Sequence, residues 1–304
     1  MTDPPNPEET AASPLGAPFT TAANSALGAV RYVLFDVDDT LTWEDRLPRA
    51  AAAALYDAHD AGLTLLAVTG RSAAWAELLL RLFPLRAVVA ETGGCAFVRR
   101  ADGRVDVLHH EDATVRAAHA QTRDAVAREL LQTLPGTRLA LDCPGRLYDT
   151  AFDLKENGPA VDSATAQALR AALHARGFVT AQSSVHINAW LVGPAGPFDK
   201  ARMTARVFDE VLLESLDAAR DAVLYLGDSP NDGPMFARAG LSVGVRNVAP
   251  HLAELAARGQ SPHFVVDKDG GYGVAEVISR VIACRREGIA RSRPGDATQP
   301  RGKI

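Results

Sequence analysis

The chain of 304 residues is long enough for one large domain or two modest ones, and its 47% hydrophobic content supports a buried core. A formal net charge of -5 gives no overall positive charge to recruit nucleic acid or an acidic membrane. No apolar run reaches the ~18 residues that a membrane span needs, and residues 1–21 lack the basic start and apolar centre of a secretory signal. We therefore expect a cytoplasmic protein that binds neither nucleic acid nor a membrane. The sequence indicates no oligomeric state.

Strand and helix patterns alternate in the first third of the chain. They follow a segment, residues 1–27, that is rich in Pro, Ala and Thr and that we expect to be a flexible tail. Short apolar runs predict buried strands, and a Pro near the start and a Gly after the end bound the first helical pattern. The predicted elements are strand 32–35, helix 48–61, strand 63–68, helix 72–83 and strand 86–90. This βαβαβ order predicts a parallel sheet with helices on its faces.

The pattern then changes to a mixed α+β segment. Asp102-Gly103 between two short apolar runs is a strong hairpin signal, and a long helical pattern follows. The predicted elements are strands 96–100 and 104–109, helix 113–134, strand 151–154, helix 163–176, and strands 178–183 and 185–192. We interpret residues 94–196 as an inserted cap domain, with a return hinge at the Gly- and Pro-rich residues 193–197.

Alternation resumes after the hinge. The predicted elements are helix 199–217, strand 222–226, helix 232–239, strand 241–245, helix 250–258, strand 264–266 and helix 274–284. The sequence therefore predicts an α/β fold: a doubly wound, parallel-sheet (Rossmann-like) core, residues 28–93 and 197–285, with an inserted α+β cap. Residues 286–304, which are basic and contain Pro and Gly, are expected to be a second flexible tail.

Unusual polar side chains follow the predicted strands at their carboxyl ends. Asp36 and Asp38 follow the first strand, and two carboxylates there are costly to bury without a function. Thr69-Gly70 follows the second strand, Asp228 follows strand 222–226, and Lys200 opens the helix after the cap. Because ligands of doubly wound sheets bind beyond the carboxyl ends of the strands, we expect these segments to converge on one site.

The chemistry of these groups suits a phosphorylated ligand. Thr69 offers a hydroxyl beside a helix start that favours an anion, and Lys200 offers a positive charge. Asp36 and Asp228 are hard oxygen ligands of the kind that Mg²⁺ prefers. The pair Asp36 and Asp38 suits a metal-assisted reaction in which one carboxylate attacks and the other transfers a proton.

Four segments in order resemble the four motifs of the haloacid dehalogenase-like phosphohydrolases. They are Asp36-Val37-Asp38-Asp39-Thr40, Thr69-Gly70-Arg71, Lys200 and Gly227-Asp228-Ser229-Pro230-Asn231-Asp232. The resemblance covers about residues 30–284, and the position of the insertion, between the second and third motifs, is similar to that of the Cof-like, type IIB branch. Members of that branch include sugar-phosphate phosphatases and phosphomannomutases.

The resemblance implies a role for each matching residue. Asp36 would attack phosphorus and become an aspartyl phosphate, and Asp38 would protonate the leaving oxygen and then activate water. The side chains of Asp36 and Asp228 and the backbone carbonyl of Asp38 would hold Mg²⁺, and Asp232 would assist through a water or by orienting Lys200. The phosphate would be held by Thr69, Gly70, Lys200 and Asn231.

Two segments are candidates for substrate contact. Many type IIB members have Glu-Asn-Gly-Ala after the third strand, whereas this chain has Glu91-Thr92-Gly93-Gly94 and so lacks one amide. In the cap, strand alternation places four polar or aromatic side chains on one face, namely Ser184, His186, Asn188 and Trp190. This face would suit a sugar, through hydrogen bonds and stacking, or it could be an ordinary solvent-facing side of a sheet.

The sequence therefore predicts a Mg²⁺-dependent phosphatase that hydrolyses a small phosphorylated metabolite, most simply a sugar phosphate. A phosphomutase of the phosphomannomutase type would use the same aspartyl phosphate and remains an alternative. A non-catalytic sugar-phosphate-binding regulator is a third reading, against which the complete set of motif carboxylates argues.

Overall fold

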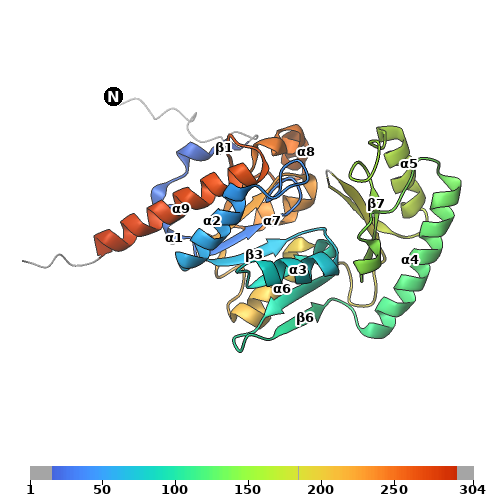
Figure 1. The fold of residues 1–304 in the computed structure, drawn as a ribbon, viewed down its shortest axis with the longest axis horizontal. Coiled ribbons are helices and arrows are strands. Elements are labelled where there is room, and N and C mark those ends of the chain that lie inside the picture. Colours follow the sequence, from blue (N-terminus) through green and yellow to red (C-terminus); the bar gives the residue numbers. More distant parts are fainter. Residues whose placement is uncertain (1–15, 184, 293–304) are drawn as a thin grey trace, which may run out of the picture.

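A computed structural model describes residues 16–183 and 185–292, and Figure 1 shows them as two bodies side by side. The larger body is built on a nine-stranded sheet of order β1-β12-β11-β10-β2-β3-β4-β5-β6. Its strands are β1 Ala17–Pro18, β2 Tyr32–Phe35, β3 Thr64–Val68, β4 Ala87–Ala90, β5 Cys95–Arg99, β6 Val105–His109, β10 Val223–Gly227, β11 Leu241–Gly244 and β12 Phe264–Val265. Across the sheet, neighbouring strands pair in parallel from the edge strand β1 as far as β4. The last two strands, β5 and β6, pair antiparallel. The predicted α/β fold with a doubly wound sheet is confirmed.

Helices cover both faces of this sheet because its strands are apolar on both sides. On β2, Val33 and Phe35 pack into one hydrophobic cluster while Tyr32 and Leu34 pack into the other. The first cluster is covered by α1 Asn24–Ala29, α2 Arg49–Asp60, α3 Ala73–Leu82 and α9 Gly270–Ser292. The second is covered by α6 Lys200–Val207, α7 Gly233–Arg238 and α8 Leu252–Ala257. The result is a three-layer body with two hydrophobic cores.

The smaller body, which we call the cap, has a three-stranded antiparallel sheet of order β7-β9-β8. Its elements are α4 Ala113–Thr133, β7 Asp149–Asp153, α5 Ser163–His174, β8 Val179–Gln182 and β9 His186–Trp190. Apolar side chains of both helices and of the sheet form a separate core that includes Leu130, Phe152, Leu169 and Ile187. Helix α4 lies on the side of the cap away from the larger body (Figure 1).

The start of the expected cap needs correction. The hairpin β5–β6, which the sequence places in the segment 94–196, pairs with β4 and extends the main sheet. The cause is the short connection Glu91–Gly93, which returns the chain directly alongside β4. The chain crosses into the cap only after His109.

Both expected tails also contain structure. Residues 16–27, assigned above to the first tail, include β1, which pairs with β12, and the first part of α1, whose Leu27 is fully buried. At the other end, α9 continues to Ser292 instead of ending before residue 286. Residues 1–15 and 293–304 lie outside the described part of the chain.

The helix predicted over residues 199–217 is shorter than expected. Helix α6 ends at Val207, one π-helical turn follows at Phe208–Leu212, and Leu213 adopts a left-handed conformation with φ of 58°. A left-handed residue stops the helical hydrogen-bond pattern, although the apolar spacing of this stretch continues.

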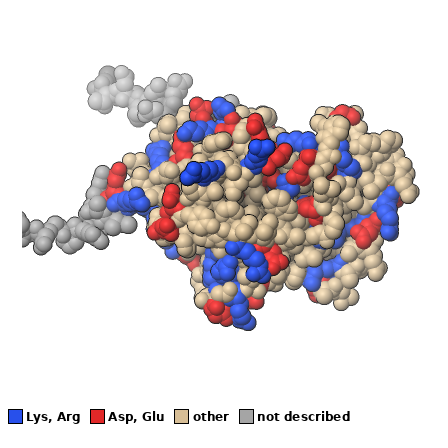
Figure 2. Space-filling model, viewed as in Figure 1, with Lys and Arg blue, Asp and Glu red and all other residues tan. Residues whose placement is uncertain are grey.

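Charged side chains of both signs are interspersed over the face drawn in Figure 2, on the larger body and on the cap. None of the helices in the described residues combines the length and the apolar character needed to cross a membrane.

Candidate active site

Three buried aspartates meet where two neighbouring strands end. Strands β2 and β10 run parallel with Phe35 opposite Leu226, so that Asp36 and Asp228 leave the sheet almost side by side. Asp232 comes from the turn after β10, and carboxylate oxygens of Asp36, Asp228 and Asp232 lie within 4.8 Å of one another. Parallel strands thus bring together residues that are almost 200 positions apart in the sequence.

The turn after β10 fixes the orientation of Asp232. The backbone N–H groups of Asp228 and Ser229 donate to its Oδ2 at 3.0 and 3.2 Å, and the hydroxyl of Tyr225 donates to its Oδ1 at 2.6 Å. Gly227 makes this possible, because a Cβ there would lie 2.6 Å from the Asp232 carboxylate. The hydroxyl of Thr40 donates to Oδ1 of Asp228 at 2.9 Å and orients the second carboxylate.

Lys200, the first residue of α6, contacts two of these three carboxylates. Its Nζ donates to Oδ1 of Asp36 at 2.8 Å, Oδ1 of Asp232 at 2.6 Å and Oδ1 of Asn231 at 3.1 Å, and the side chain is fully buried. Burial lowers the pKa of Lys200, but Asp232 and Asp36 more than offset this and leave the pKa above its ordinary value. Lys200 is therefore a cation with a fixed position.

The aspartates carry more negative charge than Lys200 balances. Burial, followed by Asp232 and Asp38, raises the pKa of Asp36 to about 7 in spite of Lys200. Burial, followed by Asp232 and Asp36, raises the pKa of Asp228 well above its ordinary value. A divalent cation would offset this excess charge, and clustered carboxylate oxygens are the donors that Mg²⁺ prefers. The residues therefore fit a magnesium site.

The turn after β3 lies against the cap. The hydroxyl of Thr69 accepts the backbone N–H of Arg71 at 3.0 Å, which leaves its own proton available. The carbonyl of Gly70 accepts hydrogen bonds from Arg146 at 2.9 Å and from Asn188 at 3.2 Å, and both of these donors belong to the cap. The predicted phosphate-binding turn is thus also a contact between the two bodies.

Asp38 lies outside the cluster of three and is paired with Arg71. Nε of Arg71 donates to both oxygens of Asp38 at 2.8 and 2.9 Å, and its Nη2 donates to Oδ1 at 2.6 Å. Nη2 also donates to Glu156 of the cap at 2.7 Å, and the other oxygen of Glu156 lies 3.1 Å from Nε2 of His186. A chain of charged groups therefore connects Asp38 to the cap sheet. From the sequence, Glu156 belongs to a short polar cap loop, Lys155-Glu156-Asn157, for which solvated charge is the favoured interpretation, and the structure instead pairs it with Arg71 and His186.

Glu91 is a second connection that the sequence did not indicate. It is fully buried and accepts backbone N–H groups from Ala73 in the larger body and from three residues at the start of β7, namely Leu147, Tyr148 and Asp149. Burial, followed by the charge of Asp149, raises the pKa of Glu91 to about 7. In the sequence, the only signals for this role were that residue 91 is a glutamate and that it follows a predicted strand.

The face of the cap named above looks toward the larger body and is buried. His186 contacts Glu156, Asn188 donates to Asp149 at 2.7 Å and to Gly70, and Trp190 stacks on Phe198 with ring centroids 5.2 Å apart. These side chains therefore do not form a solvent-facing sheet side. Ser184, the fourth member of the set, lies outside the described residues.

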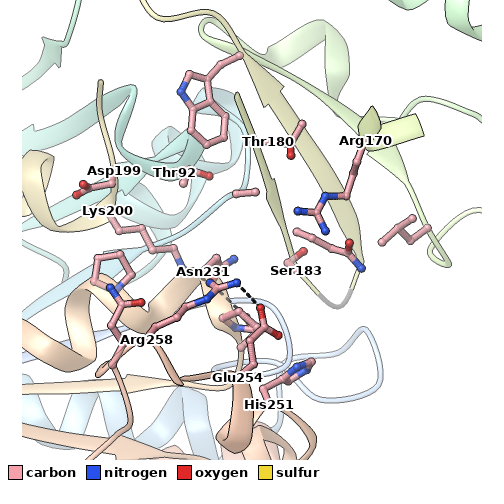
Figure 3. A pocket seen from close by; sticks show the side chains of 18 residues that line it. Thr92, Arg170, Thr180, Ser183, Asp199, Lys200, Asn231, His251, Glu254 and Arg258 are labelled. Atoms are coloured by element: carbon pink, nitrogen blue, oxygen red, sulfur yellow. Dashed lines mark hydrogen bonds and ion pairs between the residues drawn. The ribbon is translucent and has the colours of Figure 1, made fainter. Parts of the chain in front are cut away.

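A hollow of about 460 Å³ lies between part of the cap and the larger body, and we call it the cap–core hollow (Figure 3). Lys200 and Asn231 line it on one side, and Thr180, Ser183 and Arg170 line it on the cap side. Two residues of the candidate site thus belong to the wall of a space of the size that small-molecule sites have.

The chain is similar in sequence to known proteins. A family model described as haloacid dehalogenase-like hydrolase matches residues 209–278. A phosphoglycolate phosphatase of Methanothermobacter thermautotrophicus is 28% identical over 270 residues, which are 83% of this chain and 99% of that protein.

Two solved structures share the fold. A Thermoplasma acidophilum protein superposes with a TM-score of 0.63 at 21% identity, over 83% of this chain and 98% of that one. The sucrose-phosphatase of Synechocystis, solved with sucrose and phosphate, superposes with a TM-score of 0.56 at 18% identity, over 82% of this chain and 97% of that one. With the four motifs gathered at one sheet edge beneath a cap, the chain is similar to the haloacid dehalogenase-like hydrolases in sequence and in fold.

Proposed function

We propose that the protein is a Mg²⁺-dependent phosphatase that hydrolyses a small phosphorylated metabolite, a sugar phosphate, through an aspartyl phosphate on Asp36. The arrangement of Lys200 carries this proposal: one buried cation is bonded to Asp36 and to Asp232 within the cluster of three carboxylates. Such a cation and a nearby metal site together attract a phosphate group to the carboxylate that attacks it.

Asp36 has one oxygen suited to the attack. Oδ1 accepts the hydrogen bond of Lys200, whereas Oδ2 has no hydrogen-bond partner among residues 16–183 and 185–292. In the first step a carboxylate oxygen of Asp36 forms a bond to phosphorus, the bond from phosphorus to the leaving oxygen breaks, and Asp38 gives that oxygen a proton.

The second step returns the enzyme to its starting state. Asp38 takes a proton from water, the water oxygen attacks phosphorus, and the bond between phosphorus and Asp36 breaks to release phosphate. Arg71 holds the Asp38 carboxyl in place through bonds from Nε and Nη2. Side chains of Asp36, Asp228 and Asp232 and the carbonyl of Asp38 would hold Mg²⁺, which supplies positive charge against the phosphate.

The substrate class rests on the cap and on the relatives. We propose that the phosphate is bound by Thr69, Gly70, Lys200 and Asn231. The leaving group would contact the cap face formed by Ser184, His186, Asn188 and Trp190. Two of the similar proteins described above, a phosphoglycolate phosphatase and a sucrose-phosphatase, are named for small phosphorylated compounds. The cap–core hollow is large enough for a leaving group of that kind.

The test is phosphate release from a panel of sugar phosphates and small phosphomonoesters. The wild-type protein is expected to release phosphate with Mg²⁺ and to stop when EDTA is added, and Asp36→Asn is expected to release none. Analysis of products from labelled substrate separates hydrolysis from transfer of the phosphate within the sugar. Full turnover by Asp36→Asn, or labelled isomer in place of free phosphate, contradicts the proposal.

A further inference from the structure

The charged groups that line the cap–core hollow are paired, with one exception. Lys200 is bonded to Asp36 and Asp232, and Asp199 lies 3.4 Å from Nε of Arg202. Arg258 is paired with Glu254, as the dashed line in Figure 3 shows. The exception is Arg170 on α5: among the described residues its guanidinium has neither a hydrogen bond nor an ion pair.

Arg170 is well placed to meet a ligand. Figure 3 shows its guanidinium directed from the cap side into the hollow, opposite Lys200 and Asn231. Because Lys200 is already neutralised by carboxylates, Arg170 leaves the hollow with an excess positive charge away from the phosphate site. A guanidinium presents paired donors that match a carboxylate or phosphate better than they match a single hydroxyl.

Two buried polar atoms of residues that line this hollow lack partners. Oγ1 of Thr92 and Nε1 of Trp190 are buried and have no hydrogen-bond partner within residues 16–183 and 185–292, and both residues line the hollow. Thr92 is held in a left-handed conformation, with φ of 56°, and its Oγ1 lies 3.7 Å from the point where a Cβ on Gly70 would stand.

A buried donor without a partner costs folding free energy, and a ligand that supplies the partner recovers it. Trp190 can only donate through Nε1, so the atom that it meets must be an acceptor. The hydroxyl of Thr92 can donate or accept beside the Gly70 turn. Both atoms are therefore unmet hydrogen-bonding groups in the wall of the hollow, whereas Arg170 is the group directed into the space itself.

We propose that the cap–core hollow is a leaving-group subsite that selects phosphomonoesters carrying a second anionic group, a carboxylate or another phosphate, which binds Arg170. The inference rests on the proposed phosphatase activity, and it narrows the substrates from small phosphorylated metabolites in general to phosphorylated sugar acids, small phosphorylated acids and bisphosphates.

The experiment compares esters that differ in the second anion alone. Suitable pairs are phosphoglycolate with 2-hydroxyethyl phosphate, 6-phosphogluconate with sorbitol 6-phosphate, and fructose 1,6-bisphosphate with fructose 6-phosphate. The readout is the ratio of kcat/KM for the anionic ester to kcat/KM for its neutral partner, measured for the wild type, Arg170→Gln and Arg170→Lys. Arg128→Gln on α4 is the matched control, because Arg128 is an exposed cap arginine that does not line the hollow.

We expect the wild-type ratio to exceed 1 for at least one pair and to fall about tenfold or more in Arg170→Gln, the range of a charge-assisted hydrogen bond. Arg170→Lys should restore part of the ratio, Arg128→Gln should leave it at the wild-type value, and raising the salt from about 50 to about 500 mM should lower the wild-type ratio.

A wild-type ratio near 1 for every pair, or an unchanged ratio in Arg170→Gln, overturns the inference while phosphate release from neutral esters leaves the phosphatase proposal standing. Release of no phosphate from any ester by the wild-type protein instead contradicts the proposed function itself.

Discussion

Replacing Asp228 with asparagine is expected to stabilise the metal-free protein and to abolish its response to Mg²⁺. Asp228 is buried with carboxylates of Asp36 and Asp232 within 4.8 Å. At an effective dielectric constant of ~20, two unit charges about 4.8 Å apart repel by about 3.5 kcal/mol. Two such repulsions act on Asp228, and Lys200 reduces them in part because it donates to Asp36 and Asp232.

Asparagine removes the remaining repulsion and keeps the acceptor for the hydroxyl of Thr40. Because the carboxylates can also relieve part of the repulsion by taking up a proton, we expect a gain of about 2 kcal/mol in the free energy of unfolding in EDTA. Mg²⁺ at about 100 times its dissociation constant should stabilise the wild-type protein by about 2.7 kcal/mol and the variant not at all.

The assay is urea unfolding near neutral pH, in EDTA and in excess Mg²⁺. Asp221→Asn is the control, since Asp221 is an exposed carboxylate away from the cluster, and it should change neither value by more than about 0.5 kcal/mol. A variant Asp228→Asn that is less stable than wild type in EDTA, or that still gains stability from Mg²⁺, refutes the assignment of excess negative charge to this site.

Three other predictions concern groups around the cluster. Lys200→Met should lower the free energy of unfolding in EDTA by about 3–5 kcal/mol, because Asp36 and Asp232 lose their buried cation; a loss below about 1 kcal/mol in urea unfolding contradicts this. The hydrogen bond with His186, and then Arg71, lowers the pKa of Glu156 to about 2, so its contribution is present above its ordinary pKa and is lost as pH falls through about 2. The stability difference between wild type and Glu156→Gln should therefore be about 1 kcal/mol at pH 6, allowing for solvent screening, and should shrink below pH ~4; a difference that grows in acid is inconsistent with the pairing. Thr92→Val should unfold with an equal or about 1 kcal/mol higher free energy, because it removes a buried hydroxyl that has no partner; a clear loss of stability in urea unfolding argues against an unpaired hydroxyl.

The sequence predicts the part of this structure that depends on strand periodicity and on motif order. Asp36, Thr69 and Asp228 each follow an apolar run, and parallel pairing of β10, β2 and β3 necessarily brings their strand ends to one edge. Local patterns also locate most elements of the cap. The fold class and the convergence of Asp36, Asp228 and Lys200 could therefore be predicted from the sequence.

Contacts between distant side chains were not accessible in the same way. The pairing of Arg71 with Asp38 and Glu156 depends on how the cap sits on the larger body, and no spacing in the sequence encodes that position. The sequence pattern of the hairpin β5–β6 is the same whether the hairpin begins a cap or extends a sheet. The hairpin lies in the main sheet because β5 pairs with the otherwise free edge of β4.

The central claim, that Asp36 becomes phosphorylated, can be measured at that residue. Enzyme quenched during turnover with Mg²⁺ and a hydrolysed phosphomonoester is treated with borohydride, which reduces an aspartyl phosphate to homoserine, and the peptide that contains residue 36 is sequenced by mass spectrometry. Homoserine is expected at position 36 in the wild-type protein, and it should be absent with EDTA and in Asp36→Asn. Steady phosphate release by wild-type enzyme that never yields homoserine at position 36, or that yields it at another aspartate, contradicts the account.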